Sequence, residues 1–261
     1  MSMQCISYWV SKLEPLCAEI ETEYLDFIID QSGLDYSIIP ALEEFSPPLQ
    51  WQSLYLGLPE ESLPEIAPLL IRIVLNAPLQ RQWFIELAYK TQTRTPLLAI
   101  GSQWTFSTLA EWLTDCVDAT HEGRSGLFRY FDARLFPWLF SDILQPEQQV
   151  QLRRPALFWS WLDLDARPAL LIGHGAPLGR GEKCQKIAFS DEQFEVMMCL
   201  CDVRLFLRHR SLPNSWFNSQ EERFSACFRA MLDATKNGIL LDNDREEWVM
   251  NTLVERHSPA E

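Results

Sequence analysis

The sequence has little positive charge and lacks any apolar run long enough to cross a bilayer. It holds 22 Lys and Arg against 36 Asp and Glu, which gives a formal net charge of −14 at pH 7. A chain this acidic offers no long basic face for a phosphate backbone, so we expect it not to bind nucleic acid. Its apolar runs are far shorter than the about 20 residues of a membrane-spanning helix, so we expect no membrane insertion.

Paired cysteine spacings and the marks of a secretory signal are also lacking. The seven cysteines are scattered and odd in number, and reduced thiols in the cytoplasm are the simplest account. Cys199 and Cys201 lie in a segment with helical spacing, where side chains two residues apart diverge, so we expect no shared metal ion. The first residues show no apolar signal region. We therefore predict a cytoplasmic protein without metal or cofactor.

The motifs of common enzymes are absent. The glycine-rich stretch 173–184 resembles a phosphate-binding loop, but Glu182 separates Gly181 from Lys183, and Cys184 follows where such a loop needs Ser or Thr. We interpret this stretch as a flexible connection, because glycines serve turns far more often than phosphates. The sequence thus predicts a protein that is not an enzyme.

One arrangement keeps an alternative open. Asp163 and Asp165 alternate at the end of an expected strand, and His174 lies in a loop. A carboxylate pair can carry out acid–base chemistry, although two aspartates at a solvated strand end are the more ordinary interpretation. An enzyme or small-molecule binder that uses these three residues therefore remains an alternative hypothesis.

What the sequence does contain is a large apolar fraction, 47% of its residues, in a pattern of short runs between helical stretches. The short apolar runs predict strands over residues 24–30, 51–58, 67–75 and 96–102, and residues 79–90 have moderate helical spacing. Continuous apolar strands separated by helices indicate a lobe of the α+β or α/β class, with a mixed sheet and flanking helices.

A clear helical pattern follows over residues 107–120, where the apolar residues Leu109, Trp112, Leu113, Cys116 and Val117 form one stripe. Thr108 with Glu111 predicts a capping box at its start, although Ser107 could cap instead. Apolar segments at 158–165 and 168–175 come next.

The tail has helical periodicity only. Ser190 with Gln193 and Ser219 with Glu222 fit capping boxes, and the pattern predicts a bundle of three helices. We place a boundary near residue 187, which divides the chain into an α/β lobe, 1–187, and a small helical lobe, 188–261. The first helix is expected to carry one apolar stripe, made of Phe194, Met197, Met198, Cys201 and Leu205.

The stretch LFRYFDARLFPWLF, residues 127–140, places three charges among six aromatic side chains. We expect its strand to end near Phe131 and Asp132 to cap a short helix after it, paired with Arg129 or Arg134. In this interpretation the charges stabilise a turn within the fold itself. Direct contact with a partner protein is the other interpretation.

The same stretch resembles the Phe-Arg-Tyr/Phe-Tyr/Phe-Asp-Pro-Arg-Val/Leu signature of the type VI secretion effector-adaptor (chaperone) family. The resemblance covers about residues 24–165 in matching order, including the strand that ends at Asp30. Two features depart from it: Ala133 replaces the usual Pro, and the helix at 107–120 is acidic where many members are basic. The signature falls on Phe128, Arg129, Tyr130, Phe131, Asp132, Arg134 and Leu135.

The resemblance implies a bacterial, non-catalytic adaptor that binds the N-terminal region of an effector and couples it to the VgrG spike. An immunity-type inhibitor of a toxin is a further alternative, since an acidic protein can block a basic toxin site. Adaptors need apolar and aromatic anchors, and the variable tail is expected to influence which cargo is bound. Candidate partner-binding residues are Trp138, Trp159, Trp161, Met197 and Met198, although the core of the bundle remains the simpler place for the two methionines.

Overall fold

The computed structural model describes residues 3–94 and 96–258 of the chain. It divides into two compact units, Met1–Phe189 and Ser190–Glu261. The boundary expected near residue 187 coincides with the first residue of β9 (Ile187–Phe189). In the described part, no helix is both long and apolar enough to cross a membrane.

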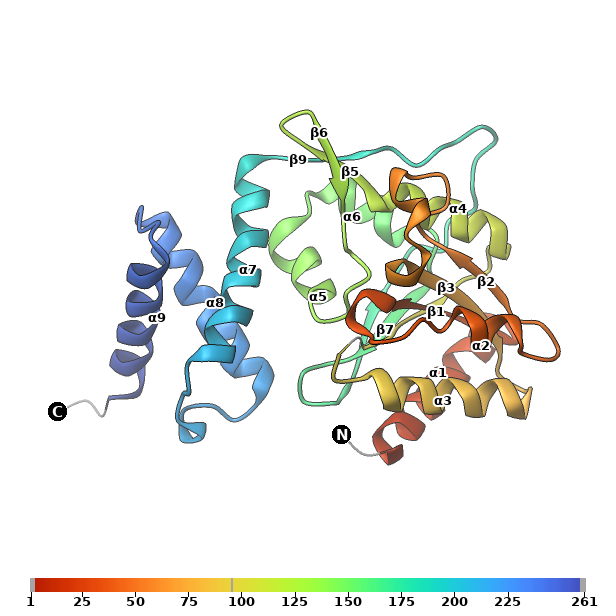
Figure 1. Ribbon diagram of the computed structural model, residues 1–261, viewed down its shortest axis with the longest axis horizontal. Coiled ribbons are helices and arrows are strands. Elements are labelled where there is room, and N and C mark those ends of the chain that lie inside the picture. Colours follow the sequence, from red (N-terminus) through yellow and green to blue (C-terminus); the bar gives the residue numbers. More distant parts are fainter. Residues whose placement is uncertain (1–2, 95, 259–261) are drawn as a thin grey trace. The chain divides into compact units, whose positions relative to one another are not determined.

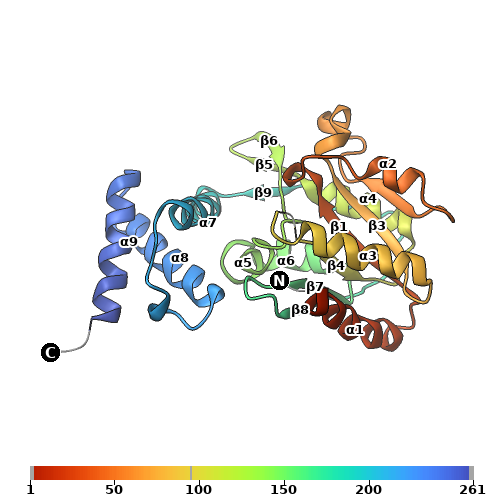
Figure 2. The same cartoon turned by 60° about the horizontal axis from the view of Figure 1, so that its bottom comes forward.

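A six-stranded sheet forms the centre of the first unit (Figures 1 and 2). Its order is β2-β3-β1-β4-β7-β8, and all neighbouring strands are antiparallel. A second sheet is mixed, because β5 (Asp118–His121) pairs antiparallel with β6 (Arg124–Leu127) and parallel with β9. The predicted class, a lobe of strands and helices followed by a helical unit, is confirmed. The strands of the main sheet are β1 (Tyr24–Asp30), β2 (Gln50–Ser53), β3 (Pro68–Val74), β4 (Leu98–Gly101), β7 (Phe158–Leu162) and β8 (Pro168–Ile172).

Helices cover both faces of this sheet. On one face, Trp9 of α1 (Met3–Glu19) contacts Phe84 of α3 (Pro78–Thr91), and Phe84 packs on Phe27 of β1. Trp9 also donates a hydrogen bond from Nε1 to Ser160 Oγ on β7, at 2.9 Å. The helices near the other face are α4 (Phe106–Val117), α5 (Phe136–Trp138) and α6 (Pro146–Arg153), and α2 (Ile39–Glu43) precedes β2.

A buried ion pair lies on that second face. Asp26 of β1 accepts two hydrogen bonds from the Arg72 guanidinium on β3, both at 2.8 Å. The Arg72 guanidinium also lies over the Tyr24 ring, 3.7 Å from its centroid. Because Asp26 is fully buried, its charge requires such a partner.

The sequence predicted several of these elements and missed others. The strand at 24–30 is confirmed, but β2 ends at Ser53, since the chain turns at Gly57 with φ 81°. The helix predicted over 107–120 ends at Val117, where β5 takes over. Its N-cap is Thr105, whose side chain accepts from the Thr108 backbone, so the capping box expected at Thr108 and Glu111 is wrong.

The second unit consists of α7 (Asp191–His209), α8 (Gln220–Lys236) and α9 (Asp242–His257). The Ser190–Gln193 capping box is confirmed, and Ser219 accepts from the Glu222 backbone N–H at 3.0 Å. The stripe predicted on α7 is not its buried face. Phe194, Met198, Cys201 and Leu205 are exposed, and the buried residues of α7 are Gln193, Cys199, Leu200, Val203 and Phe206.

Candidate functional site

The signature residues form a pair of turns after β6. The strand ends at Leu127, so the prediction that it continues to about Phe131 is wrong. Tyr130 and Phe131, which follow the strand, are both buried. The backbone turns instead: the Asp132 N–H donates to Arg129 O, and the Leu135 and Phe136 N–H groups donate to Asp132 O.

Asp132 holds the second turn with its side chain. Its Oδ1 accepts from the Arg134 backbone N–H at 3.0 Å, and its carboxylate accepts two bonds of 2.7 Å from the Arg134 guanidinium. The first residue of α5 is Phe136, and its cap, Leu135, makes no side-chain capping bond. Asp132 therefore satisfies a backbone donor just before α5, although it is not the N-cap that we expected.

Arg129 joins the signature to the end of β1. Its Nη2 forms an ion pair with Asp30 Oδ2 and donates to Ser32 Oγ at 2.9 Å. The other oxygen of Asp30 accepts from the Ser32 backbone N–H at 3.0 Å. Asp30 is nearly buried, while the Arg129 side chain is about half exposed. The two arginines of the signature thus have different carboxylate partners, and both pairs lie within this unit.

The rings of the signature pack inward. Tyr130 donates from its hydroxyl to Leu113 O on α4 at 2.9 Å, and complete burial raises the pKa of this phenol well above its usual value. Phe128 meets Phe189 of β9 with centroids 4.9 Å apart. Ala133, where the adaptor family usually has Pro, is buried as well. These contacts make the signature an internal joint between β1, α4 and the small sheet.

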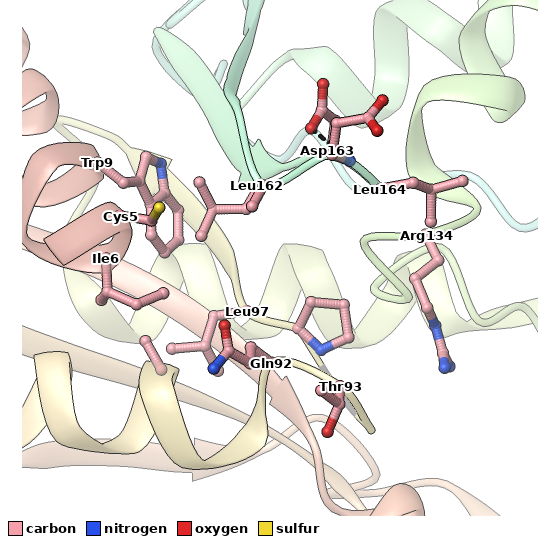
Figure 3. Close-up of a pocket in the computed structure, with 14 residues that line it drawn as sticks. Cys5, Ile6, Trp9, Gln92, Thr93, Leu97, Arg134, Leu162, Asp163 and Leu164 are labelled. Carbon is pink, nitrogen blue, oxygen red and sulfur yellow. Dashed lines mark hydrogen bonds between the residues drawn. The ribbon is translucent and has the colours of Figure 1, made fainter. Parts of the chain in front are cut away.

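A pocket of about 620 Å³ adjoins this joint (Figure 3). Cys5 and Trp9 of α1 form one side of it, and Leu162 and Asp163 of β7 and the turn after it form another (Figure 3). Arg134 lines its edge. Its volume lies in the range of small-molecule ligand pockets. Apolar groups dominate the remaining lining, which includes Ile6, Ala88, Pro96, Leu97, Leu164 and Ala166.

Gln92 lines the same pocket and carries a buried, unsatisfied polar atom. Its Nε2 donates to Tyr89 O at 2.8 Å. Among the described residues, none donates a hydrogen bond to its Oε1 atom, which is buried. A buried acceptor without a partner is costly. This buried acceptor lies beside a pocket whose lining is mainly apolar.

The three predicted polar candidates do not form one site. Asp163 and Asp165 both line the pocket, whereas His174 is not among its lining residues. Asp163 Oδ1 accepts from the backbone N–H groups of Asp165, at 2.9 Å, and Arg167, at 2.7 Å. One oxygen of Asp163 thus stabilises the turn between β7 and β8.

The aromatic candidates lie in the core. Trp138, Trp159 and Trp161 are buried, and Phe136 contacts the last two rings with centroids 5.0 and 5.3 Å away. None of the three presents an exposed ring. Of the two candidate methionines in the second unit, Met198 is exposed and Met197 is half-buried.

Sequence reasoning missed α1, and with it one wall of the pocket. The signal was present, because Ile6, Trp9, Val10, Leu13 and Cys17 recur at helical spacing and are all buried. Gln92 and the pairing of Arg129 with Asp30 gave no such signal, since they depend on contacts between distant parts of the chain.

Comparison with known proteins found one family. Residues 27–151 match the family described as "Domain of unknown function (DUF4123)". Neither the search of curated proteins nor the search of solved structures found a match. The matched span begins within β1, ends within α6 and contains the whole signature. Residues 27–151 are therefore similar to this domain of unknown function.

Proposed function

We propose that the chain is a non-catalytic adaptor that binds the N-terminal region of a type VI secretion effector and couples it to the VgrG spike in the bacterial cytoplasm. The observation that carries the proposal is the signature at 128–135. It resembles that of the effector-adaptor family, and it lies inside the span that matches one domain family. The resemblance, over 24–165, covers nearly the same part of the chain as the match over 27–151.

The geometry supports a scaffold role for the signature in such an adaptor. Asp132 and Arg129 are paired within the fold, and the rings of the signature are buried. Charges that are already paired have little to offer a partner. In this proposal the cargo binds to the surface beside the signature, where the pocket offers apolar walls.

This pocket fits one side chain, or a short helical face, of a partner protein. Apolar anchors inserted into pockets give most of the binding energy at protein interfaces. Asp163 and Asp165 at its rim favour a partner segment with a basic residue next to the anchor. An effector segment that combines apolar residues with Lys or Arg has the chemistry required.

Co-purification of the full chain with a candidate effector and a VgrG protein from the same organism tests the proposal. We expect a complex with each that survives size-exclusion chromatography. Leu164, which lines the pocket and is 39% exposed, should be replaced by Glu, with Leu63→Glu as the control at 41% exposure. The Leu164 variant should lose effector and keep VgrG, and the control should keep both.

Each other outcome has a meaning. Binding of neither protein by the wild type contradicts the adaptor function. Neutralisation of the purified toxin by the chain, without VgrG binding, favours the immunity-type inhibitor. Full effector binding by both variants leaves the adaptor function intact and excludes the pocket as the cargo site.

A further inference from the structure

Two cysteines from distant parts of the chain meet next to the signature. Cys116 lies in the last turn of α4 and is buried, and Cys184 lies in the segment between β8 and β9 and is half-buried. Their Sγ atoms are 3.5 Å apart. A disulfide needs about 2.05 Å between its sulfurs, so a small movement of one side chain would bring them to bonding distance.

Other contacts hold the Cys184 segment in this place. The side chain of Gln151 on α6 forms two hydrogen bonds with the Gln185 backbone. Its Nε2 donates to Gln185 O at 2.6 Å, and the Gln185 N–H donates to Gln151 Oε1 at 3.1 Å. Two residues before Cys184, Glu182 forms an ion pair with Arg154 at 2.7 Å. The two sulfurs therefore face each other within an ordered arrangement.

The two thiols differ in access to solvent, and burial affects the Cys116 thiol in particular. Cys184 lines a pocket of about 560 Å³ together with Trp112, Lys183 and Lys186, whereas Cys116 does not line it. The hydrogen bond with Cys184 and complete burial raise the pKa of the Cys116 thiol well above its usual value. A small oxidant thus reaches Cys184 first, and Cys116 stays protonated until its neighbour has reacted.

We propose that Cys116 and Cys184 form a reversible disulfide when the chain meets a peroxide. The Cys184 sulfur attacks one peroxide oxygen, the O–O bond breaks, and a sulfenic acid and one water result. The Cys116 sulfur then attacks the Cys184 sulfur, the S–S bond forms, and the S–O bond breaks. The leaving hydroxide takes the Cys116 proton and departs as a second water. Two thiols are oxidised, one hydrogen peroxide is reduced to two waters, and a thiol reductant reverses the change.

The bond would fasten the segment between β8 and β9 to α4. This segment carries the exposed residues Gly179, Arg180 and Gly181, where the backbone is accessible to a protease. Oxidation should therefore protect the Arg180 site from trypsin by several-fold. This inference does not depend on the adaptor function.

Peptide mapping of the full chain tests it. The protein is treated with hydrogen peroxide, blocked with N-ethylmaleimide in denaturant and digested with trypsin without reductant. Cleavage after Lys and Arg leaves Cys116 in peptide 95–124 and Cys184 in peptide 184–186, each with a single cysteine. We expect these two peptides joined, an intact mass lower by two hydrogens, and separate peptides again after dithiothreitol.

Cys184→Ser and Cys5→Ser complete the experiment, since both positions are half-buried and tolerate a small polar side chain better than Cys116. The Cys5 variant should form the same joined peptides, and the Cys184 variant should leave Cys116 fully labelled by N-ethylmaleimide. Wild-type protein in which Cys116 is still labelled after peroxide overturns the proposal. So does a disulfide between any other pair.

Discussion

At the scale of single residues, two ion pairs explain how buried carboxylates are tolerated within apolar segments. Asp132 is nearly buried, yet each of its oxygens accepts a charge-assisted bond of 2.7 Å from Arg134. Asp30 is equally buried and is held by Arg129 and by the Ser32 backbone. Both carboxylates also fix a backbone turn, so each one stabilises the local fold as well as its ion pair.

Asp132→Ala should destabilise the protein. It removes a backbone bond and leaves Arg134 without its partner; breaking a buried pair costs about 3–5 kcal/mol, and partial exposure of Arg134 favours the lower end. Asp35→Ala is the matched control, because it removes an exposed pair with Arg94 that is worth about 0–1 kcal/mol. Urea denaturation measures both. Equal unfolding free energies for the two variants would contradict the scaffold role of Asp132.

The sequence predicted part of this residue-scale picture. A charge among rings must be paired, and that rule alone favoured a pair between Asp132 and one of two arginines. It could not assign Arg129 to Asp30, because these two residues are 99 positions apart in the sequence and only the fold brings them together. The same limit applies to Gln92. The burial of its unsatisfied oxygen depends on the packing of α1 and of the turn after β7, which the sequence alone does not show.

At the scale of elements, the segment after β8 is packed more tightly than its glycines suggest. We interpreted 173–184 as a flexible connection, but its first residues are bound to the chain before β7. The N–H groups of Gly173, His174 and Gly175 donate to the carbonyls of Leu157, Arg153 and Ala156, at 2.8–3.1 Å. A Cβ on Gly173 would overlap the Ala156 carbonyl oxygen, so glycine is required there for close backbone approach.

Gly173→Ala should therefore destabilise the first unit by about 1–3 kcal/mol, the usual cost of overpacking. Gly126→Ala is the control, since a Cβ at that position meets no atom within 4 Å and its φ is not positive. Thermal melting compares the two variants. If the melting temperature of Gly173→Ala equals that of the wild type, the close approach between the Gly173 and Ala156 backbones is not needed for the fold.

The apolar stripe on α7 was predicted by its spacing, but its environment was not. A helix has an apolar stripe either because it packs in a core or because it binds a partner, and spacing cannot separate these cases. Here Phe194, Met198 and Leu205 are exposed, while Leu200, Val203 and Phe206 are buried. This exposed stripe has the chemistry of an adaptable partner surface.

Met198→Glu should weaken effector binding by about tenfold or more, as loss of an interface anchor usually does. Met198 is 46% exposed, and Val254→Glu on α9, at 44%, is the control for an added charge in the same unit. Isothermal titration of the full chain with purified effector measures both affinities. Unchanged binding by the Met198 variant would exclude the α7 stripe from cargo contact.

At the scale of the whole molecule, composition and periodicity predicted the order of an α/β lobe and a helical tail. They did not predict that the main sheet is entirely antiparallel. Strand order depends on which apolar faces find each other, and β1 pairs with both β3 and β4 although α3 lies between those two in the sequence. The pocket could not be predicted for the same reason, because α1, α3 and the turn after β7 meet only in the folded unit.

Delivery in the organism that encodes the chain tests the proposed adaptor function most directly. The gene for this chain is deleted, and the effector and VgrG are measured by immunoblot in cells and in the secreted fraction, with re-expression of the wild type as the control. We expect VgrG to be secreted as before, while the effector stays in the cells until the chain is restored. Secretion of the effector at wild-type levels in the deletion strain would contradict the proposed adaptor function.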